Sequence, residues 1–246
     1  MKPTLLFVPG AWHSPAHYDR IIELLSEYPC EIVTLATVGP IDPANTDADT
    51  DVEIISKAID QILSQGNDIV LIAHSYGGIP ALSAAYSFVD RKPGIKAIAL
   101  MASFLYPPQT SLIMPLGNQP APFHKIEGDL VHVGDPGPEV LFYNDLSSEE
   151  ASRWTKILKP HSWRSKEKPP SSEGVGWWFI PTSYLVCEND NAIPAPFQRK
   201  MISDANEAYV ARGSNWKIRE EVVDSGHSPF LSMPDQAADF IRRTTG

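Results

Sequence analysis

A continuous apolar run at residues 69–73, Ile-Val-Leu-Ile-Ala, constrains the fold of this chain more than any other feature. A strand that is apolar at every position must be covered on both faces, as in a parallel sheet. Other strand-like runs follow along the chain, separated by amphipathic stretches with helical spacing. Since parallel strands are joined by such helical crossovers, the alternation predicts an α/β protein with a mostly parallel sheet flanked by helices.

The expected elements can be placed from these patterns. Strands are expected at residues 4–8, 31–35, 69–73, 95–101, 183–187 and 217–223. One helix is expected after Ser14, which reads as an N-cap followed by a proline at the first helical position. Further helices are expected at residues 52–63, 79–89, 147–159, 194–205 and 234–243.

The pattern changes between residues 104 and 181. This stretch contains eleven prolines and, apart from the helix expected at 147–159, no long periodic segment. It is too long for a simple loop. We therefore predict an inserted cap subdomain, residues 104–181, over one end of a core formed by residues 1–103 and 182–246. Ligands of open α/β sheets bind at the carboxyl ends of the strands, where such a cap would enclose them.

Charge and composition exclude several classes of function. The 246 residues include 20 Lys and Arg against 30 Asp and Glu, a formal net charge of −10. This balance argues against nucleic acid and against an anionic membrane surface as partners. No apolar run is long enough to span a bilayer, and the first residues lack the pattern of a signal peptide. We expect a cytoplasmic protein, a monomer or homodimer, that acts on a small molecule.

Metal and disulfide chemistry are also disfavoured. Cys30 and Cys187 can form at most one disulfide, and they are too few for a cysteine-rich zinc site. Four histidines have no metal-ligand spacing: His17, His124, His132 and His161. We expect no metal and no cofactor.

Residues 73–78, Ala-His-Ser-Tyr-Gly-Gly, form the most informative motif. They follow a buried strand and open a helix, where a serine on a sharp, strained turn presents its Oγ at the end of the sheet. Gly77 and Gly78 permit the close approach of strand and helix that such a turn requires. Ser75 is therefore the candidate nucleophile. The alternative is an ordinary serine in a glycine-rich turn.

A serine nucleophile needs a base and an acid that orients the base. In this architecture they follow the serine in the order acid, then histidine. Glu188 and Asp190 both come directly after the strand expected at 183–187, and His227 lies between the last strand and the last helix. The order and context of these residues predict a Ser-His-acid triad.

Four segments resemble the α/β-hydrolase superfamily, and within it the small methylesterase and hydroxynitrile-lyase group. They are residues 8–13, 73–78, 186–194 and 225–227, which together span nearly the whole chain. In the family pattern the acid lies four residues before a proline, which implies Asp190 rather than Glu188. The resemblance also implies that the backbone N–H groups of Ala11 and Tyr76 form the oxyanion hole. Ala73 departs from the glycine that the family usually has there.

The resemblance implies a cofactor-independent serine hydrolase that cleaves an ester or lactone of a small, largely apolar molecule through an acyl-enzyme at Ser75. Many similar hydroxynitrile lyases have threonine or asparagine where Gly10 stands, and one group has lysine where Ser228 stands. Both differences favour hydrolysis. Two alternatives stay open: a C–C lyase or cyclase in which His227 deprotonates the substrate without an acyl-enzyme, and a ligand receptor on a hydrolase scaffold.

Substrate contacts are expected from large side chains near the nucleophile and in the cap. The candidates are Trp12, His13, Phe104, Trp154 and Trp178. For His13 the alternative role is to brace the loop that contains Ala11.

Overall fold

The computed structural model describes residues 2–246. Its centre is a six-stranded sheet in the order β2-β1-β3-β4-β8-β9, in which all neighbouring strands are parallel. The strands are β1 (Thr4–Val8), β2 (Cys30–Ile32), β3 (Ile69–His74), β4 (Ile95–Met101), β8 (Thr182–Cys187) and β9 (Arg219–Val223). The predicted parallel α/β architecture is confirmed.

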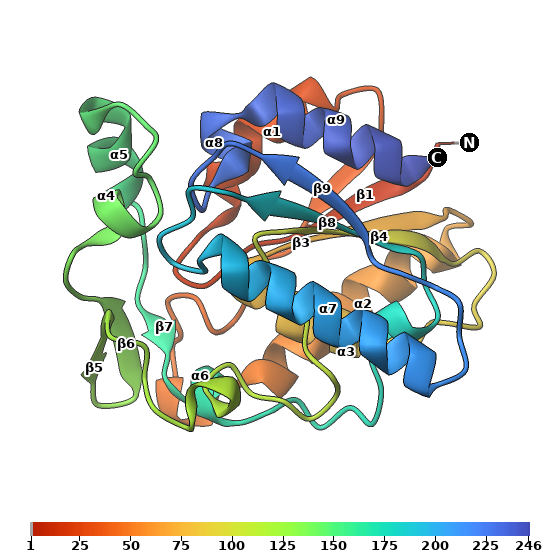
Figure 1. The fold of residues 1–246 in the computed structure, drawn as a ribbon, viewed down its shortest axis with the longest axis horizontal. Coiled ribbons are helices and arrows are strands. Elements are labelled where there is room, and N and C mark those ends of the chain that lie inside the picture. The colour runs from red at the N-terminus through yellow and green to blue at the C-terminus, as the bar shows by residue number, and fades with distance from the viewer. Residues whose placement is uncertain (1) are drawn as a thin grey trace.

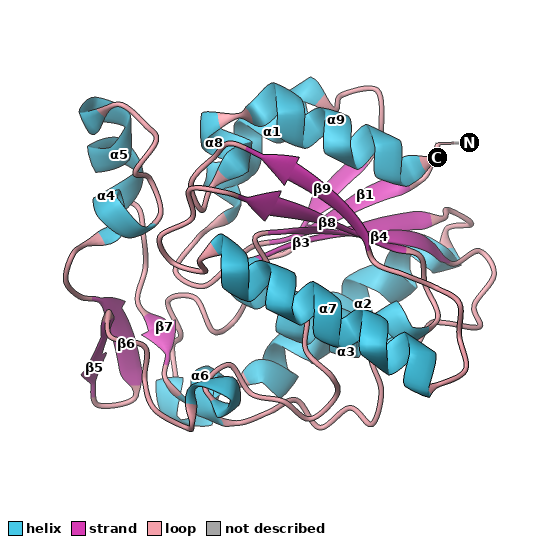
Figure 2. Ribbon diagram, viewed as in Figure 1, coloured by secondary structure: helices cyan, strands magenta, loops and turns pink. Residues whose placement is uncertain are grey.

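Helices cover both faces of this sheet (Figures 1 and 2). One face is covered by α1 (Asp19–Leu24), α8 (Pro229–Ser232) and α9 (Pro234–Thr245), the other by α2 (Ala48–Ser64), α3 (Gly78–Tyr86) and α7 (Ala195–Ala211). Alternate residues of β1 enter two separate cores: Leu5 and Phe7 on one face, Leu6 and Val8 on the other. This two-sided burial explains why the central strands are apolar at nearly every position.

Several element boundaries differ from the prediction, one of them because of local capping. Helix α2 begins at Ala48 rather than at residue 52, since the Asp47 side chain accepts hydrogen bonds from the amides of Asp49 and Thr50. Helix α5 (Ser148–Thr155) ends earlier than expected. The side chain of Ser147 caps its beginning by accepting from the amide of Glu150. Helix α7 continues to Ala211, beyond the predicted end at residue 205.

The segment from 104 to 181 contains a second, antiparallel sheet of three strands that the sequence did not predict. Its strands are β5 (His124–Glu127), β6 (Leu130–Val133) and β7 (His161–Ser162). Strands of two to four residues are too short to show the alternation of apolar and polar side chains by which a strand is recognised in a sequence. The same segment holds α4 (Pro138–Leu141), α5 and α6 (Arg164–Glu167). Figure 1 shows α4, α5 and this sheet on the side toward which the arrows of β8 and β9 point.

Short 3-10 helices complete the fold: η1 (Pro15–Tyr18), η2 (Pro43–Asn45), η3 (Ser75–Gly77), η4 (Met114–Leu116) and η5 (Gly176–Trp178). Helix η5 packs against the core rather than over the end of the sheet. The Trp177 ring lies 5.2 Å from that of Tyr209 on α7, and its indole N–H donates to the carbonyl of Tyr106. The exact division of the chain into cap and core stays a prediction.

Candidate active site

Ser75 lies on a strained turn between β3 and η3. Its φ angle is 52°, in the left-handed region that non-glycine residues rarely adopt. A Cβ atom on Gly77 would lie 2.4 Å from the carbonyl oxygen of Pro9, and one on Gly78 would lie 2.3 Å from the Oγ of Ser103. The two glycines therefore allow strand and helix to approach closely, and the turn presents the Ser75 side chain to the cavity described below.

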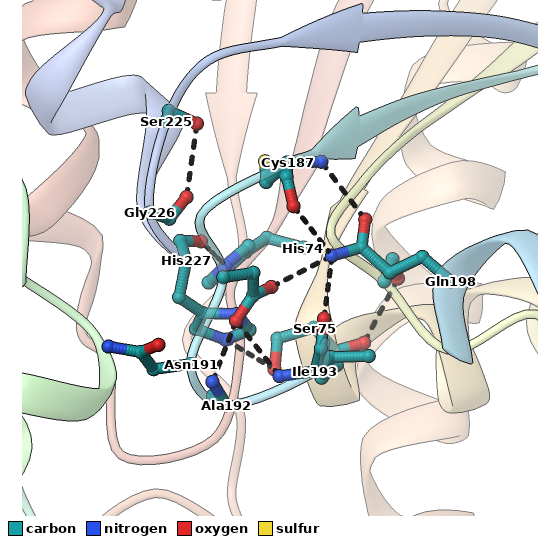
Figure 3. Close-up of polar contacts among 12 residues, drawn as sticks. His74, Ser75, Cys187, Asn191, Ala192, Ile193, Gln198, Ser225, Gly226 and His227 are labelled. Carbon is teal, nitrogen blue, oxygen red and sulfur yellow. Dashed lines mark hydrogen bonds and ion pairs between the residues drawn. The ribbon is translucent and has the colours of Figure 1, made fainter. Parts of the chain in front are cut away.

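The three predicted triad residues are brought together at the carboxyl ends of the strands; Figure 3 labels Ser75 and His227 among them. The Nε2 of His227 lies 3.0 Å from the Oγ of Ser75, and its Nδ1 lies 2.8 Å from the Oδ2 of Asp190. Because an ionised carboxylate can only accept, Nδ1 donates to Asp190 and the lone pair of Nε2 faces the serine hydroxyl. All three residues are buried. This arrangement allows His227 to take the Ser75 proton.

Of the two candidate acids, only Asp190 contacts His227. Its Oδ1 accepts hydrogen bonds of 2.8 Å from the amides of both Ala192 and Ile193. Glu188 instead has an exposed side chain that forms an ion pair with Arg199, and this guanidinium lowers the pKa of the Glu188 carboxyl. The geometry thus agrees with the choice of acid that the proline spacing implied.

Gln198 on α7 holds the acid in place and was missed from the sequence. Its Nε2 donates to the Oδ2 of Asp190 at 3.0 Å and to the carbonyl of Ile193 at 2.7 Å, while its Oε1 accepts from the amide of Cys187 at 3.1 Å. The side chain is fully buried. One signal could have found it: a polar residue at helical spacing among the apolar, buried residues Ala195, Met201, Ile202 and Ala205.

His74 supports the loop that contains His227. Burial and the neighbouring His227 hold the pKa of its imidazole well below the usual value, so the ring is neutral. Its Nε2 donates to the backbone carbonyl of His227 at 2.9 Å, which leaves Nδ1 to accept from the Tyr18 hydroxyl at 3.0 Å. His74 therefore links the loop of His227 to η1.

Two backbone amides are candidates for an oxyanion hole. Ala11 and Tyr76, the residues implied by the resemblance, both line the same cavity as Ser75. Among residues 2–246, the amide of Ala11 has no backbone acceptor outside regular elements. An N–H group of this kind is free to stabilise a developing negative charge.

A cavity of about 610 Å³ opens beside Ser75 and His227. This volume suits a small molecule. Most of its walls are apolar. The apolar side chains include Leu112, Phe123, Leu141, Phe142, Ile193 and Phe197. The polar residues in the wall include His124, Asp135, Lys166 and Asn191. The sequence did not point to Phe142, His124 or Lys166, because the segment from 104 to 181 has no periodicity that would tell inward from outward positions.

Two of the five expected substrate contacts, Trp12 and Phe104, line the cavity, whereas His13, Trp154 and Trp178 do not. The Trp154 ring instead packs 5.2 Å from the ring of His17, and Trp178 packs under the guanidinium of Arg212 at 3.8 Å. Both tryptophans therefore cover the core at other places, and the prediction for them is corrected.

His13 braces the loop, the second of its two predicted roles. Its Nδ1 donates to the carbonyl of Ala11 at 2.7 Å, and its Nε2 accepts from the Tyr143 hydroxyl at 3.1 Å. Burial is the main cause that holds the His13 pKa well below its usual value, so the ring stays neutral and can accept this hydrogen bond. Tyr143 belongs to the segment from 104 to 181, so His13 ties that segment to the loop of Ala11.

Two kinds of feature are absent from the described part of the chain. Residues 2–246 contain no group of three or more His, Cys, Asp or Glu side chains arranged to bind a metal ion. No helix within the same range combines the length and the apolar character needed to cross a membrane.

Comparison with known proteins places this site in a wider context. The sequence profile of the alpha/beta hydrolase family matches residues 5–240. The alpha/beta hydrolase nvfD of Aspergillus novofumigatus is 29% identical and is aligned over 100% of this chain and 98% of its own. Methylesterase 7 of Arabidopsis thaliana is 27% identical over 70% of this chain and 67% of its own. The crystal structure of polyneuridine aldehyde esterase superposes with a TM-score of 0.76 at 18% identity, covering 100% of both chains.

Proposed function

Since this chain belongs to the alpha/beta hydrolase family, we propose that it is a cofactor-independent serine hydrolase that cleaves an ester or lactone of a small, largely apolar molecule. One observation supports this most strongly: Asp190, His227 and Ser75 are joined in a hydrogen-bonded series, and its Ser75 and His227 line a mostly apolar cavity. The similarity to a methylesterase supports an ester as the bond that is cleaved.

The proposed reaction proceeds in two halves. His227 takes the proton of Ser75 as its Oγ attacks the ester carbonyl, and the N–H groups of Ala11 and Tyr76 stabilise the oxyanion. The tetrahedral intermediate then collapses, the alcohol leaves with the proton from His227, and an acyl group remains on Ser75. Water, deprotonated by His227, attacks this acyl-enzyme, releases the acid and restores the serine. Asp190 keeps His227 in the required tautomer throughout.

Space around Gly10 favours hydrolysis over hydroxynitrile cleavage. A Cβ atom at this position would lie 2.8 Å from the Nδ1 of His74 and 2.9 Å from the Cβ of Ser75. The threonine or asparagine that many similar lyases have here would therefore displace the nucleophile turn. A lyase, a cyclase or a receptor remains an outcome of the experiment below.

The experiment compares the parent protein with Ser75→Ala on 4-nitrophenyl butanoate and on γ- and δ-lactones. We expect turnover by the parent, an acyl adduct on Ser75 in the mass spectrum of quenched reactions, and a loss of about 1000-fold or more in kcat for the variant. Turnover that survives Ser75→Ala would refute the proposal. Ligand binding without turnover in the parent would favour the receptor.

A further inference from the structure

Lys166, in the short helix α6, is a buried cation at the wall of the candidate active site. The residue has 0% exposure, it lines the cavity that contains Ser75, and its Nζ finds no hydrogen-bond partner among residues 2–246. An ammonium group without partners is costly to bury. A buried polar group that has no hydrogen-bond partner in a folded protein therefore calls for an explanation.

Aromatic rings stabilise the charge without using its donors. The Nζ lies 4.4 Å from the centroid of the Trp12 ring and 4.9 Å from that of Tyr76. A cation over an aromatic face is attracted by the ring electrons. The two rings offset part of the cost of burying the ammonium, and its three N–H bonds remain free to donate.

The nearby carboxylate of Asp51 is engaged elsewhere. It accepts hydrogen bonds from the hydroxyl of Tyr76 at 3.0 Å and from the hydroxyl and amide of Thr37 at 2.5 and 3.2 Å. Within residues 2–246, no acidic side chain forms an ion pair with Lys166. Asp51 thus supplies a counter-charge at longer range and leaves the donors of Lys166 unused.

Lys166 also lies close to the reacting groups. The two rings that it contacts belong to Trp12, which follows Ala11, and to Tyr76, which follows Ser75. Both residues line the cavity together with Ser75 and His227. A group of a bound molecule that enters the wall between Trp12 and Tyr76 would approach the ammonium.

We infer that Lys166 is a specificity-determining residue, and that the natural substrate has an anionic oxygen, a carboxylate or an ionised phenol or enol, in addition to the bond that is cleaved. The part of this inference that makes the ligand an ester or lactone rests on the proposed function. An anionic oxygen would accept from the unused donors of Nζ, and the remaining apolar walls would bind the rest of the molecule. A charge-assisted hydrogen bond of this kind is among the stronger ones in proteins.

Protonation of Lys166 makes the binding of such a ligand depend on pH. Burial lowers the pKa of the Lys166 amine to about 7. The titratable groups that face it are Asp51 of α2, Tyr76 of η3, His124 of β5 and His161 of β7. Above pH 7 Asp51 is ionised, both histidines are neutral and Tyr76 keeps its proton. Among these groups, only Lys166 changes its charge between pH 7 and 9.

The test measures binding by calorimetry in the Ser75→Ala protein, which cannot consume the probes. The first pair of probes is 4-phenylbutanoate and its neutral counterpart 4-phenylbutanamide; the second is 2,4-dinitrophenolate and 2,4-dinitroanisole. Both anions stay ionised between pH 7 and pH 9. We expect at least one anionic probe to bind about 10-fold or more tightly than its neutral counterpart at pH 7. This preference should fall at pH 9, where Lys166 is neutral, and should disappear in the double variant with Lys166→Met.

Lys200→Met is the matched control, since Lys200 is exposed on α7 and pairs only with Asp204. It removes the same charge and should leave the preference unchanged. Equal affinity for both members of each pair, or a preference that survives Lys166→Met, would overturn the inference. If Lys166→Met does not fold, the two probe pairs and their pH dependence in Ser75→Ala alone decide the question. Because no turnover is needed, failure of the esterase assay would not be mistaken for failure here.

Discussion

The side-chain amide of Gln198 donates a hydrogen bond of 3.0 Å to the Oδ2 of Asp190, the same oxygen that lies 2.8 Å from the Nδ1 of His227. The other carboxylate oxygen accepts from the amides of Ala192 and Ile193. Both oxygens of Asp190 are thus held by neighbouring groups before any substrate binds. Such preorganised support keeps the base in its reactive orientation.

Replacement of Gln198 by methionine should weaken both the fold and the site. Gln198→Met removes the donor to Asp190 and leaves the buried amide of Cys187 without its partner. We expect a loss of about 2 kcal/mol in the free energy of unfolding and a decrease in kcat of roughly 10-fold. Urea unfolding and ester hydrolysis measure the two effects. Gln236→Met, at an exposed position of α9, serves as the control and should change neither.

The two acids after β8 can be separated by paired variants. Asp190→Asn should lower kcat by about 10000-fold, because an amide at this position no longer selects the tautomer of His227 that can take the serine proton. Glu188→Gln should retain nearly full activity, since its exposed side chain contacts Arg199 instead. Equal losses in the two variants, measured with 4-nitrophenyl butanoate, would contradict the assignment of Asp190.

A larger residue at Gly10 should disturb the nucleophile turn. In Gly10→Thr the added Cβ meets His74 and Ser75 at distances that require one of them to move. A displacement of about 1 Å at the nucleophile can lower the rate roughly 100-fold. Ala16→Thr, at an exposed position of η1, is the control and should behave like the parent. Full ester hydrolysis by Gly10→Thr would remove the argument that space at this position disfavours a lyase.

Stability should depend on pH through the buried Asp51. Burial raises the pKa of its carboxyl from 3.8 to about 6, so the folded state keeps this proton to a higher pH than the unfolded state does. The contribution of this group to the free energy of unfolding therefore decreases as the pH rises from about 4 to about 6, by roughly 3 kcal/mol in all. Asp51→Asn should lack this contribution. Urea unfolding of both proteins at pH 4, 5, 6 and 7 measures the difference, and parallel pH profiles would contradict the prediction.

Prediction from the sequence succeeded where a local pattern was sufficient. The apolar run at 69–73 and the glycines after Ser75 indicated a buried strand followed by a sharp turn, and the structure has both. It failed for the short strands between residues 104 and 181 and for Trp154 and Trp178. In that segment, the direction of a side chain follows from contacts with residues far along the chain, such as His17 and Arg212.

The sequence by itself determined the parallel sheet and the order of the candidate triad, because apolar periodicity and residue spacing are local properties. Parallel strands also end at one edge, which made it predictable that Ser75, Asp190 and His227 would be neighbours. Only the tertiary structure decided which aromatic residues line the cavity, that Gln198 supports Asp190 and that Lys166 is buried without a hydrogen-bond partner among residues 2–246. Burial and the absence of hydrogen bonds result from packing between distant segments, and no local pattern records them.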